Sequence, residues 1–498
     1  MPGIQISTAT RTGRITNTVR ESSQAFFCGD ARRGPANAAV LVTSLEDFEM
    51  RFGGYNNSYL HPTVEAFFEE GGTQCYISRA FNTATGETIS SSTASVTFDD
   101  GTDDMITVYA NGPGTWAHSG QPEAVTVEIA DGTTVDTTTR IMKVFVGGTL
   151  IATTGNQLTA AAMAGRINAH PVAKNYVFAL ATTDGQTGLP DVTAATALAG
   201  GVASDALVDA DYVTALAAFG DALGTGVVGC PESTGNTIRN ALIAHANTNS
   251  RLAFLYPAAA STTQDALDYA EDVSALDHAE HAAVFYPWLS APTSVFGVSR
   301  TIPPLGYAAG ARARAHNQVG PHQPGAGIIS NARFINGVEV DITKAVGDQL
   351  DAGYVNAIRV INNTIRIYGA RSASLDTDNF RYITGQDVVN HVVIEAYRSL
   401  EDVVFTVIDG RNSVFASIEA KLIAILEPLR TLGALYEAFD AQGRRIDYGY
   451  TVKCDESLNP IANLADGTLT ARVGMRVSSI GDSINVDIVK SNLTASVT

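Results

Sequence analysis

The stretch VLVTSLEDFEMRFGG, from Val40 to Gly54, decides how the N-terminal part of the chain folds. A short β-branched run leads directly into a predicted helix, which Thr43 can cap together with Glu46. Phe48 and Phe52 then share one helix face, and the two closing glycines end the helix. This much definite structure predicts a folded α/β unit, yet no residue in it has a catalytic pattern.

The segments around this stretch extend the unit. Residues 1–24 are polar and alternate weakly, which predicts an extended arm with too little apolar surface to fold alone. Residues 25–81 predict the order strand, strand, helix, helix, strand, with the second helix starting at Pro62. We therefore expect a compact N-terminal α/β unit preceded by an arm.

Composition limits the classes of function. A chain of 498 residues exceeds one ordinary core, so about two to four domains are expected. Only 17% of residues are charged, which leaves broad neutral surface and favours self-assembly. The 32 basic and 51 acidic residues give a net charge of -19, which argues against direct nucleic-acid binding because phosphate contacts need clustered Lys and Arg.

Cysteines and hydropathy point to the cytosol. Cys28, Cys75, Cys230 and Cys454 lack CxxC spacing, so neither a zinc site nor a disulfide scaffold is expected. The N-terminus has no signal-peptide core, and no run of about 18 apolar residues occurs. We expect reduced folding and no membrane insertion.

The remainder of the chain changes character several times. Residues 82–200 are rich in Thr, Gly and Asp and predict a mostly β insertion with one Ala-rich helix, whereas residues 201–370 alternate helix and strand, as stacked βα units do. Residues 289–327 are rich in Gly, Pro and Arg and are interpreted as a loop. Two long helices, Asp387–Val407 and Ser413–Phe439, precede a β tail.

Enzyme-like motifs are present but lack their context. GTGVVG, from Gly224 to Gly229, matches GxGxxG, yet its glycines precede an apolar strand and are interpreted as a helix stop. His278 and His281 could share a helix face, but two histidines do not complete a metal site, and a helix C-terminus explains them better. We predict no catalytic, cofactor-binding or metal-binding residue and no cofactor; a nucleotide-dependent α/β enzyme is the distant alternative.

A basic cluster, ARARAHN, stands out in this acidic chain. Its residues Arg312 and Arg314 predict either a solvated loop or a contact with an acidic neighbour.

Several segments, in order, resemble the tail sheath proteins of contractile phage tails and related contractile injection systems. AFFCGDARRGPANAAVLVTSLEDFEMRFGG is similar to that family's N-terminal signature, including the RGP turn at residues 33–35. FYPWLSAP, TIPPLGYAAG, NAIRVINNTIRIYGARSAS and YTVKCDESLNP follow in family order. GPHQPGAG replaces the family's aromatic and lysine-bearing loop, and the long-helix segment is only loosely similar.

The resemblance implies an α/β and α+β multidomain fold with a discontinuous α/β core, a mostly β inserted outer domain and extended terminal arms. The expected boundaries are 1–24 for the N-terminal arm, 25–81 for the N-terminal unit, 82–200 for the outer domain, 201–370 for the core and 371–498 for the C-terminal sheath domain. It implies a structural subunit rather than an enzyme. Such subunits form stacked hexameric rings around an inner tail tube and contract to drive the tube through the host cell envelope for genome delivery.

The implied partners are copies of the same chain, the tail tube protein, and the baseplate and tail terminator proteins. The implied location is the virion tail, after assembly in the host cytoplasm. A sheath of a phage-derived contractile injection particle is the close alternative. A carbohydrate-binding site in the insertion is a third hypothesis, for which the sequence offers no motif.

Candidate contact residues follow from the resemblance and from alternation. In the family, terminal arms add strands to a small sheet of a neighbour's C-terminal domain. The residues predicted for this strand exchange are Ile4, Ile6, Ile484, Val486 and Ile488, which alternate as strand addition requires. The residues predicted for contact with the inner tube or with a neighbouring subunit are Arg312, Arg314, Arg411 and Lys421, and the tube contact is expected within residues 411–440.

Overall fold

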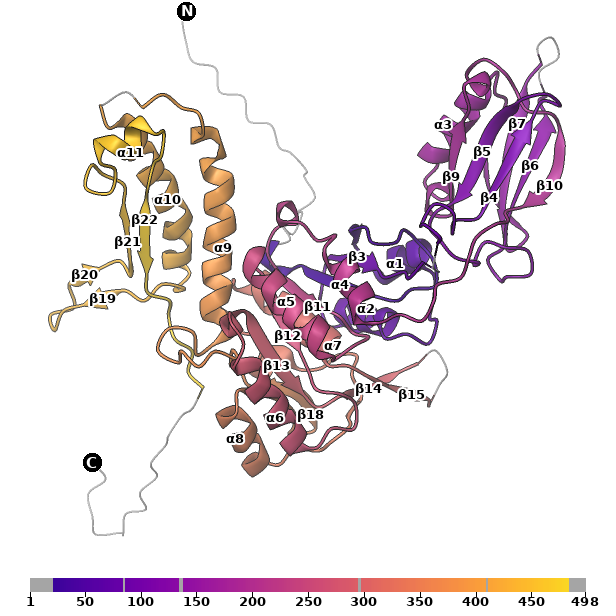
Figure 1. The fold of residues 1–498 in the computed structure, drawn as a ribbon. Coiled ribbons are helices and arrows are strands. Elements are labelled where there is room, and N and C mark those ends of the chain that lie inside the picture. The colour runs from indigo at the N-terminus through magenta and orange to yellow at the C-terminus, as the bar shows by residue number, and fades with distance from the viewer. Residues whose placement is uncertain (1–20, 84–85, 134–137, 294–296, 409–410, 483–498) are drawn as a thin grey trace, which may run out of the picture.

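The structure, a computed structural model, describes residues 21–83, 86–133, 138–293, 297–408 and 411–482. These residues form a mixed α/β main body with two smaller parts that stand off it on opposite sides (Figure 1). We call residues 95–197 the inserted module and residues 383–482 the C-terminal module. The mixed α/β class predicted from the sequence is confirmed.

An eight-stranded sheet organises the main body. Its strands, in spatial order, are β18 (Thr364–Tyr368), β17 (Val355–Ile361), β13 (Ala282–Tyr286), β12 (Leu252–Leu255), β11 (Val227–Gly229), β1 (Ala25–Gly29), β3 (Cys75–Arg79) and β2 (Val40–Val42). The pairings are parallel except at the two edges, where β18 and β2 are antiparallel to their neighbours. Because β1 pairs with β11, residues 25–79 contribute three of the eight strands of a joint sheet and do not form a separate sheet.

Helices cover both faces of this sheet. One face carries α1 (Leu45–Phe52), α2 (Leu60–Glu69) and α7 (Leu305–Gln318), and the other carries α4 (Asp209–Leu216), α5 (Asn236–Thr248), α6 (Thr263–Ser274) and α8 (Lys344–Ala352). Consecutive residues of β1 point to opposite cores, Phe27 to the first and Phe26 to the second. A strand buried on both faces has no polar side to show, which explains the continuous apolar run AFFCG.

The predicted loop over residues 289–327 is wrong in its middle. Leu305–Gln318 is helix α7, and nearly all of it is buried. Its small residues allow close approach to α2, because a Cβ added to Gly306 would lie 2.3 Å from the carbonyl oxygen of Thr63. The Gly and Arg content therefore reflects tight helix packing and buried charge, not a solvated loop. A small sheet of β14 (Leu289–Pro292), β15 (Ser299–Ile302) and β16 (Gly337–Val338) flanks it.

Helix boundaries in the N-terminal region differ slightly from the predictions. Ser44, rather than Thr43, caps α1, since its Oγ accepts a hydrogen bond from the Asp47 N–H at 3.1 Å. Gly53 ends that helix at φ 82°, as the sequence predicted. Helix α2 begins at Leu60, two residues before Pro62.

The inserted module is mostly β, as the alternating runs predicted. One sheet has the order β10 (Thr193–Ala197), β6 (Val125–Asp131), β7 (Arg140–Val146) and β8 (Thr149–Thr153), and the other has β4 (Ser95–Asp99), β5 (Asp104–Ala110) and β9 (Val177–Ala181). The predicted Ala-rich helix is α3 (Ala160–Ala169), which packs against β9 and β5 and buries Ala160, Met163 and Ile167 in the core of the module. Asn168 pairs through its amide with the N–H and carbonyl of Ala179, both at 2.8 Å, and so covers part of the β9 edge.

The C-terminal module consists of two long helices and two small antiparallel sheets. Its elements are α9 (Ile383–Leu400), α10 (Ser413–Thr431), β19 (Ala438–Phe439), β20 (Arg445–Asp447), β21 (Tyr450–Lys453), α11 (Ile461–Ala465) and β22 (Arg472–Met475). Helix α9 starts before the predicted Asp387 and stops at Leu400. Helix α10 ends at Thr431 because Gly433, at φ 78°, follows two residues later.

Short 3₁₀ helices complete the fold. They are η1 (Glu21–Ser23), η2 (Ala173–Asn175), η3 (Asp184–Gln186), η4 (Asp221–Leu223), η5 (Ala279–His281), η6 (Gly327–Ser330) and η7 (Glu401–Val403). The predicted arm 1–24 is therefore wrong at its end, because Ser22, Ser23 and Gln24 are buried in the main body.

Candidate functional site

The two basic residues singled out in the sequence lie in the protein interior. Arg312 and Arg314 sit on α7 and are 2% and 5% exposed. Arg312 donates from Nε to Asp387 Oδ2 at 3.1 Å, and Arg314 donates from Nε to the carbonyl of Ile329 at 2.8 Å. Arg314 Nη1 also lies 3.5 Å from the buried carboxylate of Glu70. Their predicted contact with a tube or neighbouring subunit is wrong, because both guanidinium groups are enclosed by their own chain.

The other two predicted contact residues lie in the C-terminal module. Lys421 on α10 donates to the Ser399 carbonyl at 2.9 Å and to Asp402 Oδ1 at 2.6 Å, so it ties α10 to the end of α9. Arg411 is exposed and lies two residues before α10. A tube contact at these two residues stays a prediction. The predicted strand-exchange residues Ile4, Ile6, Ile484, Val486 and Ile488 lie outside the described residues.

Enzymes with a doubly wound sheet bind their ligands at one crevice of the sheet. In this protein a side chain of the chain itself lies in that crevice. The sheet reverses its winding between β1 and β11, and ligands of such folds bind beside the carboxyl ends of the strands at that point. Glu232 lies there, and its Oε1 accepts hydrogen bonds from the N–H groups of Tyr59 at 2.9 Å and Leu60 at 2.8 Å. Burial, with a smaller contribution from Asp30, raises the pKa of Glu232 to about 7. A nucleotide phosphate would need these same N–H groups.

The GxGxxG match has the structure that its context predicted. Gly224 ends η4, and β11 begins at Val227, so the glycines close a helical turn before a strand. No helix begins directly after them. This site therefore does not support the alternative of a nucleotide-dependent enzyme.

The histidine pair is not on one helix face. His278 has a left-handed backbone at φ 64°, and His281 is buried in η5. Helix α6 already ends at Ser274, so the explanation by a helix C-terminus is wrong. Burial lowers the pKa of His281, whose Nδ1 lies 2.9 Å from the carbonyl of Arg251. These contacts give His281 a packing role.

Over the described ranges, no group of three or more His, Cys, Asp or Glu is arranged to hold a metal ion. Among the helices of those ranges, none combines the length and the apolar character needed to cross a bilayer.

The C-terminal module has a core of its own. Helix α10 turns a stripe of apolar side chains inward, as the sequence predicted, and the buried ones include Ile418, Leu422, Leu426 and Leu429. The sheet of β21 and β22 packs on α9 and α10 through alternate residues such as Val452 and Val473. Its other face is exposed, with alternation typical of a sheet covered on one side. A two-stranded sheet is marginal alone, so the helices stabilise it.

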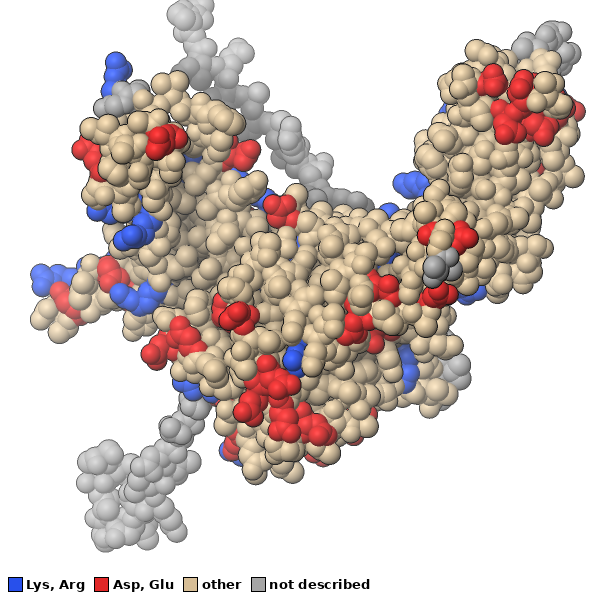
Figure 2. Space-filling model, in the orientation of Figure 1, with Lys and Arg blue, Asp and Glu red and all other residues tan. Residues whose placement is uncertain are grey.

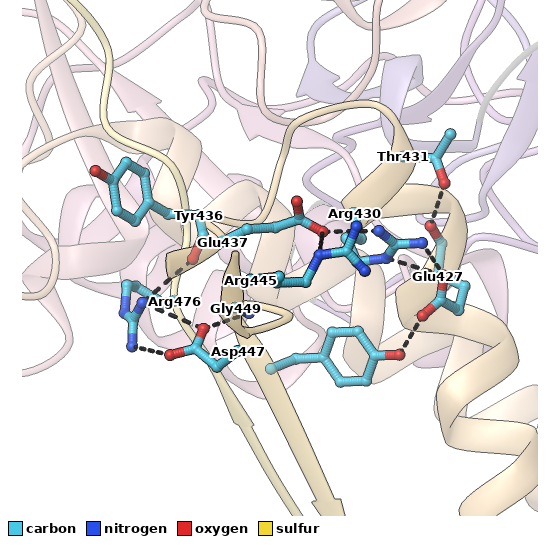
Figure 3. A network of polar contacts seen from close by, with 10 residues as sticks. Glu427, Arg430, Thr431, Tyr436, Glu437, Arg445, Asp447, Gly449 and Arg476 are labelled. Carbon is cyan, nitrogen blue, oxygen red and sulfur yellow. Dashed lines mark hydrogen bonds and ion pairs between the residues drawn. The ribbon is translucent and has the colours of Figure 1, made fainter. Parts of the chain in front are cut away.

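A polar network fixes the end of α10 against the small sheets (Figure 3). Arg430 donates from Nη2 to Glu427 Oε2 and from Nη1 to Glu437 Oε1, both at 2.7 Å. Tyr450 on β21 donates its hydroxyl to Glu427. The hydrogen bonds from Arg430 and Tyr450 lower the pKa of Glu427, whereas burial and this carboxylate raise the pKa of Tyr450 to about 12.

The same network continues to the hairpin of β19 and β20. Asp447 accepts from the Gly449 N–H at 2.8 Å and lies 3.2 Å from Arg476 Nη2. Arg476 also donates from Nη1 to the Tyr436 carbonyl at 3.3 Å. Ion pairs this close to solvent add little stability, so their effect is to orient the hairpin. In the sequence, only the spacing of Glu427 and Arg430 signals this network, which was not predicted.

Large apolar side chains are exposed around this hairpin and at the far tip of the module. The hairpin group is Tyr436, Phe439, Ile446 and Tyr448, with exposed fractions of 59%, 53%, 67% and 48%. At the tip, Val404 and Val407 are 54% and 79% exposed, and Phe405 between them is fully exposed. Exposed apolar groups of this size are typical of interaction surfaces. On the viewed face, acidic side chains gather instead around α6 and on the distal end of the inserted module (Figure 2).

Comparison by sequence finds no family profile that matches the chain and no match among curated proteins. Comparison of structures finds proteins of similar fold over almost its whole length. The contracted sheath of the extracellular contractile injection system PVC matches with a TM-score of 0.55 at 15% identity, over 99% of this chain and 98% of that one. The chain has the fold of a contractile sheath protein.

Two further sheath structures agree. The contracted helical sheath of the anti-feeding prophage matches with a TM-score of 0.55 at 12% identity, over 99% of both chains. A sheath tail protein from Listeria innocua matches with a TM-score of 0.59 at 12% identity, over 87% of this chain and 89% of that one. The resemblance found in the sequence is thus confirmed, at the level of the sheath fold.

Proposed function

We propose that this protein is a structural subunit of the contractile tail sheath of a bacteriophage. In this proposal the chain polymerises as stacked hexameric rings around an inner tail tube and contracts to drive the tube through the host cell envelope for genome delivery. The observation that supports it is the coverage of the sheath fold, which extends over 99% of the chain and so includes both modules that stand off the main body. The protein acts mechanically, not as an enzyme.

Strand exchange between subunits is the proposed way in which the rings are linked. Within the described residues, β21 and β22 pair only with each other, and a bridge between Leu435 and Val477 lies beyond the ends of both strands. The outer edge of β21 is thus available to an added strand. The proposed donors are residues 1–20 and 483–498 of neighbouring copies. A strand with about five hydrogen bonds, each worth roughly 1 kcal/mol net, contributes about 5 kcal/mol.

The proposed partners are further copies of the chain, the tail tube protein, and the baseplate and tail terminator proteins, in the tail of a virion assembled in the host cytoplasm. The exposed tip with Phe405 and Arg411 is the proposed tube contact. A sheath of a phage-derived contractile injection particle fits the fold equally well. An extracellular contractile injection system and an anti-feeding prophage stand among the similar structures beside sheath tail proteins.

Negative-stain electron microscopy of the purified chain at high concentration tests the proposal. We expect hollow tubes or stacked rings, in the contracted form because no tube or baseplate holds the extended one. Uniform small particles at every concentration, also after addition of tube protein, would contradict the function while leaving the fold intact. Particles isolated from producing cells then decide between the alternatives, because a phage particle carries DNA and an injection particle does not.

A further inference from the structure

The base of helix α9 is docked to the main body by polar side chains. Gln386, Asp387 and Asn390, in the first turns of α9, are 4%, 2% and 1% exposed. Asn390 donates to the Arg251 carbonyl at 3.2 Å, and Gln386 Nε2 lies 3.2 Å from His281 Nε2. Hydrogen bonds of this kind fix one orientation, whereas apolar surfaces can slide.

Residues 21–26, which we call the root of the N-terminal segment, are linked to the base of α9 through Asp387. Arg312 binds Asp387 and donates from Nη1 to the main-chain carbonyl of Ser22 at 2.6 Å. Gln24 donates from its amide to the Leu223 carbonyl at 2.7 Å and to the Thr225 carbonyl at 3.0 Å. A single arginine, Arg312, therefore links Ser22 to helix α9.

The charge at this contact is balanced inside the protein. His316 on α7 lies 3.4 Å from Asp387. Burial, together with the nearby Arg312, lowers the pKa of His316 to about 4, so this imidazole is neutral at pH 7. The charge of Asp387 is thus balanced by Arg312, and removing either partner would leave a buried charge alone.

Residues 478–482, which we call the root of the C-terminal segment, contact the residue directly before the same helix. Asp482 accepts a hydrogen bond from the Tyr382 hydroxyl at 2.6 Å and lies 3.4 Å from Arg371 Nη2. Tyr382 is the residue directly before α9. Arg371 is itself held, because its N–H donates at 2.6 Å to Asn356, a fully buried residue of β17.

We propose that the base of α9 is a joint that couples the roots of the two terminal segments, so that loosening one root loosens α9 and, through it, the other root. The two roots are far apart in sequence; α9 contacts the anchor of the first through Asp387, and the anchor of the second contacts Tyr382, the residue directly before α9. The coupling is a property of the single chain and does not depend on the proposed assembly.

Hydrogen exchange of the full-length monomer tests the joint. Asp387→Asn removes the charge that holds Arg312, so we expect exchange to become on the order of 10-fold faster or more in three places: residues 21–26, the first turns of α9, and residues 478–482. Exchange in the inserted module should keep its wild-type rate. Faster exchange in α9 with no change at either root would overturn the proposal.

Tyr382→Phe tests the joint at its contact with the C-terminal root. It provides a second test if the Asp387→Asn variant does not fold. It removes one surface hydrogen bond and leaves the ring in place. We expect faster exchange at residues 478–482, in α9 and at residues 21–26. A change confined to residues 478–482 would overturn the proposal. Tyr368→Phe, at an exposed tyrosine of β18, is the matched control and should change none of the three.

Discussion

Several arginines of this acidic chain are buried and make their contacts in the protein interior. Arg251 is fully buried and donates to the carbonyls of Phe219 at 2.7 Å, Gly220 at 2.6 Å and Gly224 at 2.9 Å. Its guanidinium also lies 3.8 Å from the ring centre of Phe26. A planar group with five donors can satisfy several carbonyls of one loop at once, which no other side chain does. Such arginines fasten loops to the sheet.

Arg33 is the sharpest test of this role, because it joins the main body to the inserted module. It donates to the Met50 carbonyl at 2.7 Å and to Glu123 at 3.1 Å, and its guanidinium lies 4.1 Å from the Tyr176 ring centre. We expect Arg33→Lys to lower the free energy of unfolding by about 2 to 4 kcal/mol, since an ammonium group cannot make these contacts together. Chemical denaturation measures this change.

Arg32→Lys is the matched control. Arg32 is a neighbour in sequence, is 33% exposed and lies 3.6 Å from the same Glu123. Its replacement should change stability by less than about 0.5 kcal/mol, as exposed ion pairs usually do. Equal effects of the two replacements would contradict the role of Arg33 as a fastening residue.

The raised pKa of Glu232 predicts that the stability of the folded protein depends on pH. Burial raises its pKa in the folded chain to about 7, above the ordinary value of 4.5. The neutral form is therefore favoured by folding: this contribution is complete below pH 4.5 and is lost as pH rises to about 7. We expect Glu232→Gln to be more stable than wild type at pH 8 by up to about 3 kcal/mol and equal to it at pH 4.

Thermal or chemical unfolding between pH 4 and pH 8 measures the effect. The glutamine can still accept the N–H groups of Tyr59 and Leu60, so helix α2 keeps its cap. Glu271→Gln, at an exposed position of α6, should leave the pH profile unchanged. A wild-type profile in Glu232→Gln would show that Glu232 ionises normally in the folded chain.

At the scale of elements, the contact of α2 with α7 depends on glycine. A Cβ at Gly306 would lie 2.3 Å from the Thr63 carbonyl oxygen, so the two helices could not keep their distance. We expect Gly306→Ala to destabilise the protein by about 2 kcal/mol or more through overpacking, although alanine favours helix. The midpoint of chemical denaturation measures this.

Gly165→Ala gives the opposite expectation in helix α3. A Cβ there would have no atom within 4 Å, so only the gain in helix propensity, about 0.5 to 1 kcal/mol, applies. If both alanine variants were stabilised, close packing would not be the reason for Gly306.

Element boundaries show where prediction from sequence fails. Ser44 takes the cap expected of Thr43 because only its hydroxyl reaches the Asp47 N–H, and both residue types fit the pattern equally. Helix α7 was missed because its apolar face consists of Ala and Gly, which give no periodic signal. In contrast, the stripe of α10 was predicted, since its large residues recur on one face.

At the scale of the whole molecule, the terminal segments separate folding from assembly. We expect chains lacking residues 1–20 or 484–498 to fold but not to form long tubes, because the main body is complete without them. Circular dichroism and electron microscopy measure the two properties. Wild-type-like tubes from both truncations would refute strand exchange.

A longer deletion serves as the control for the root. Removing residues 1–24 also removes Ser22 and Gln24, which are buried and hydrogen-bonded in the main body. We expect this chain to unfold at a lower denaturant concentration than the chain lacking residues 1–20. Equal midpoints would mean that residues 21–24 add nothing to the fold.

The sequence by itself determined the local elements, the mostly β character of the insertion, and the resemblance to sheath proteins, because these follow from residue periodicity and from motifs in order. Only the tertiary structure decided that β1 pairs with β11, that Arg312 and Arg314 are buried, and that Glu232 fills the crevice of the sheet. The strand pairing and the contacts of Glu232 join residues more than 150 positions apart, and the place of the two arginines depends on burial. A charged side chain has the same letter on the surface and in the core, and only its neighbours in space tell the two apart.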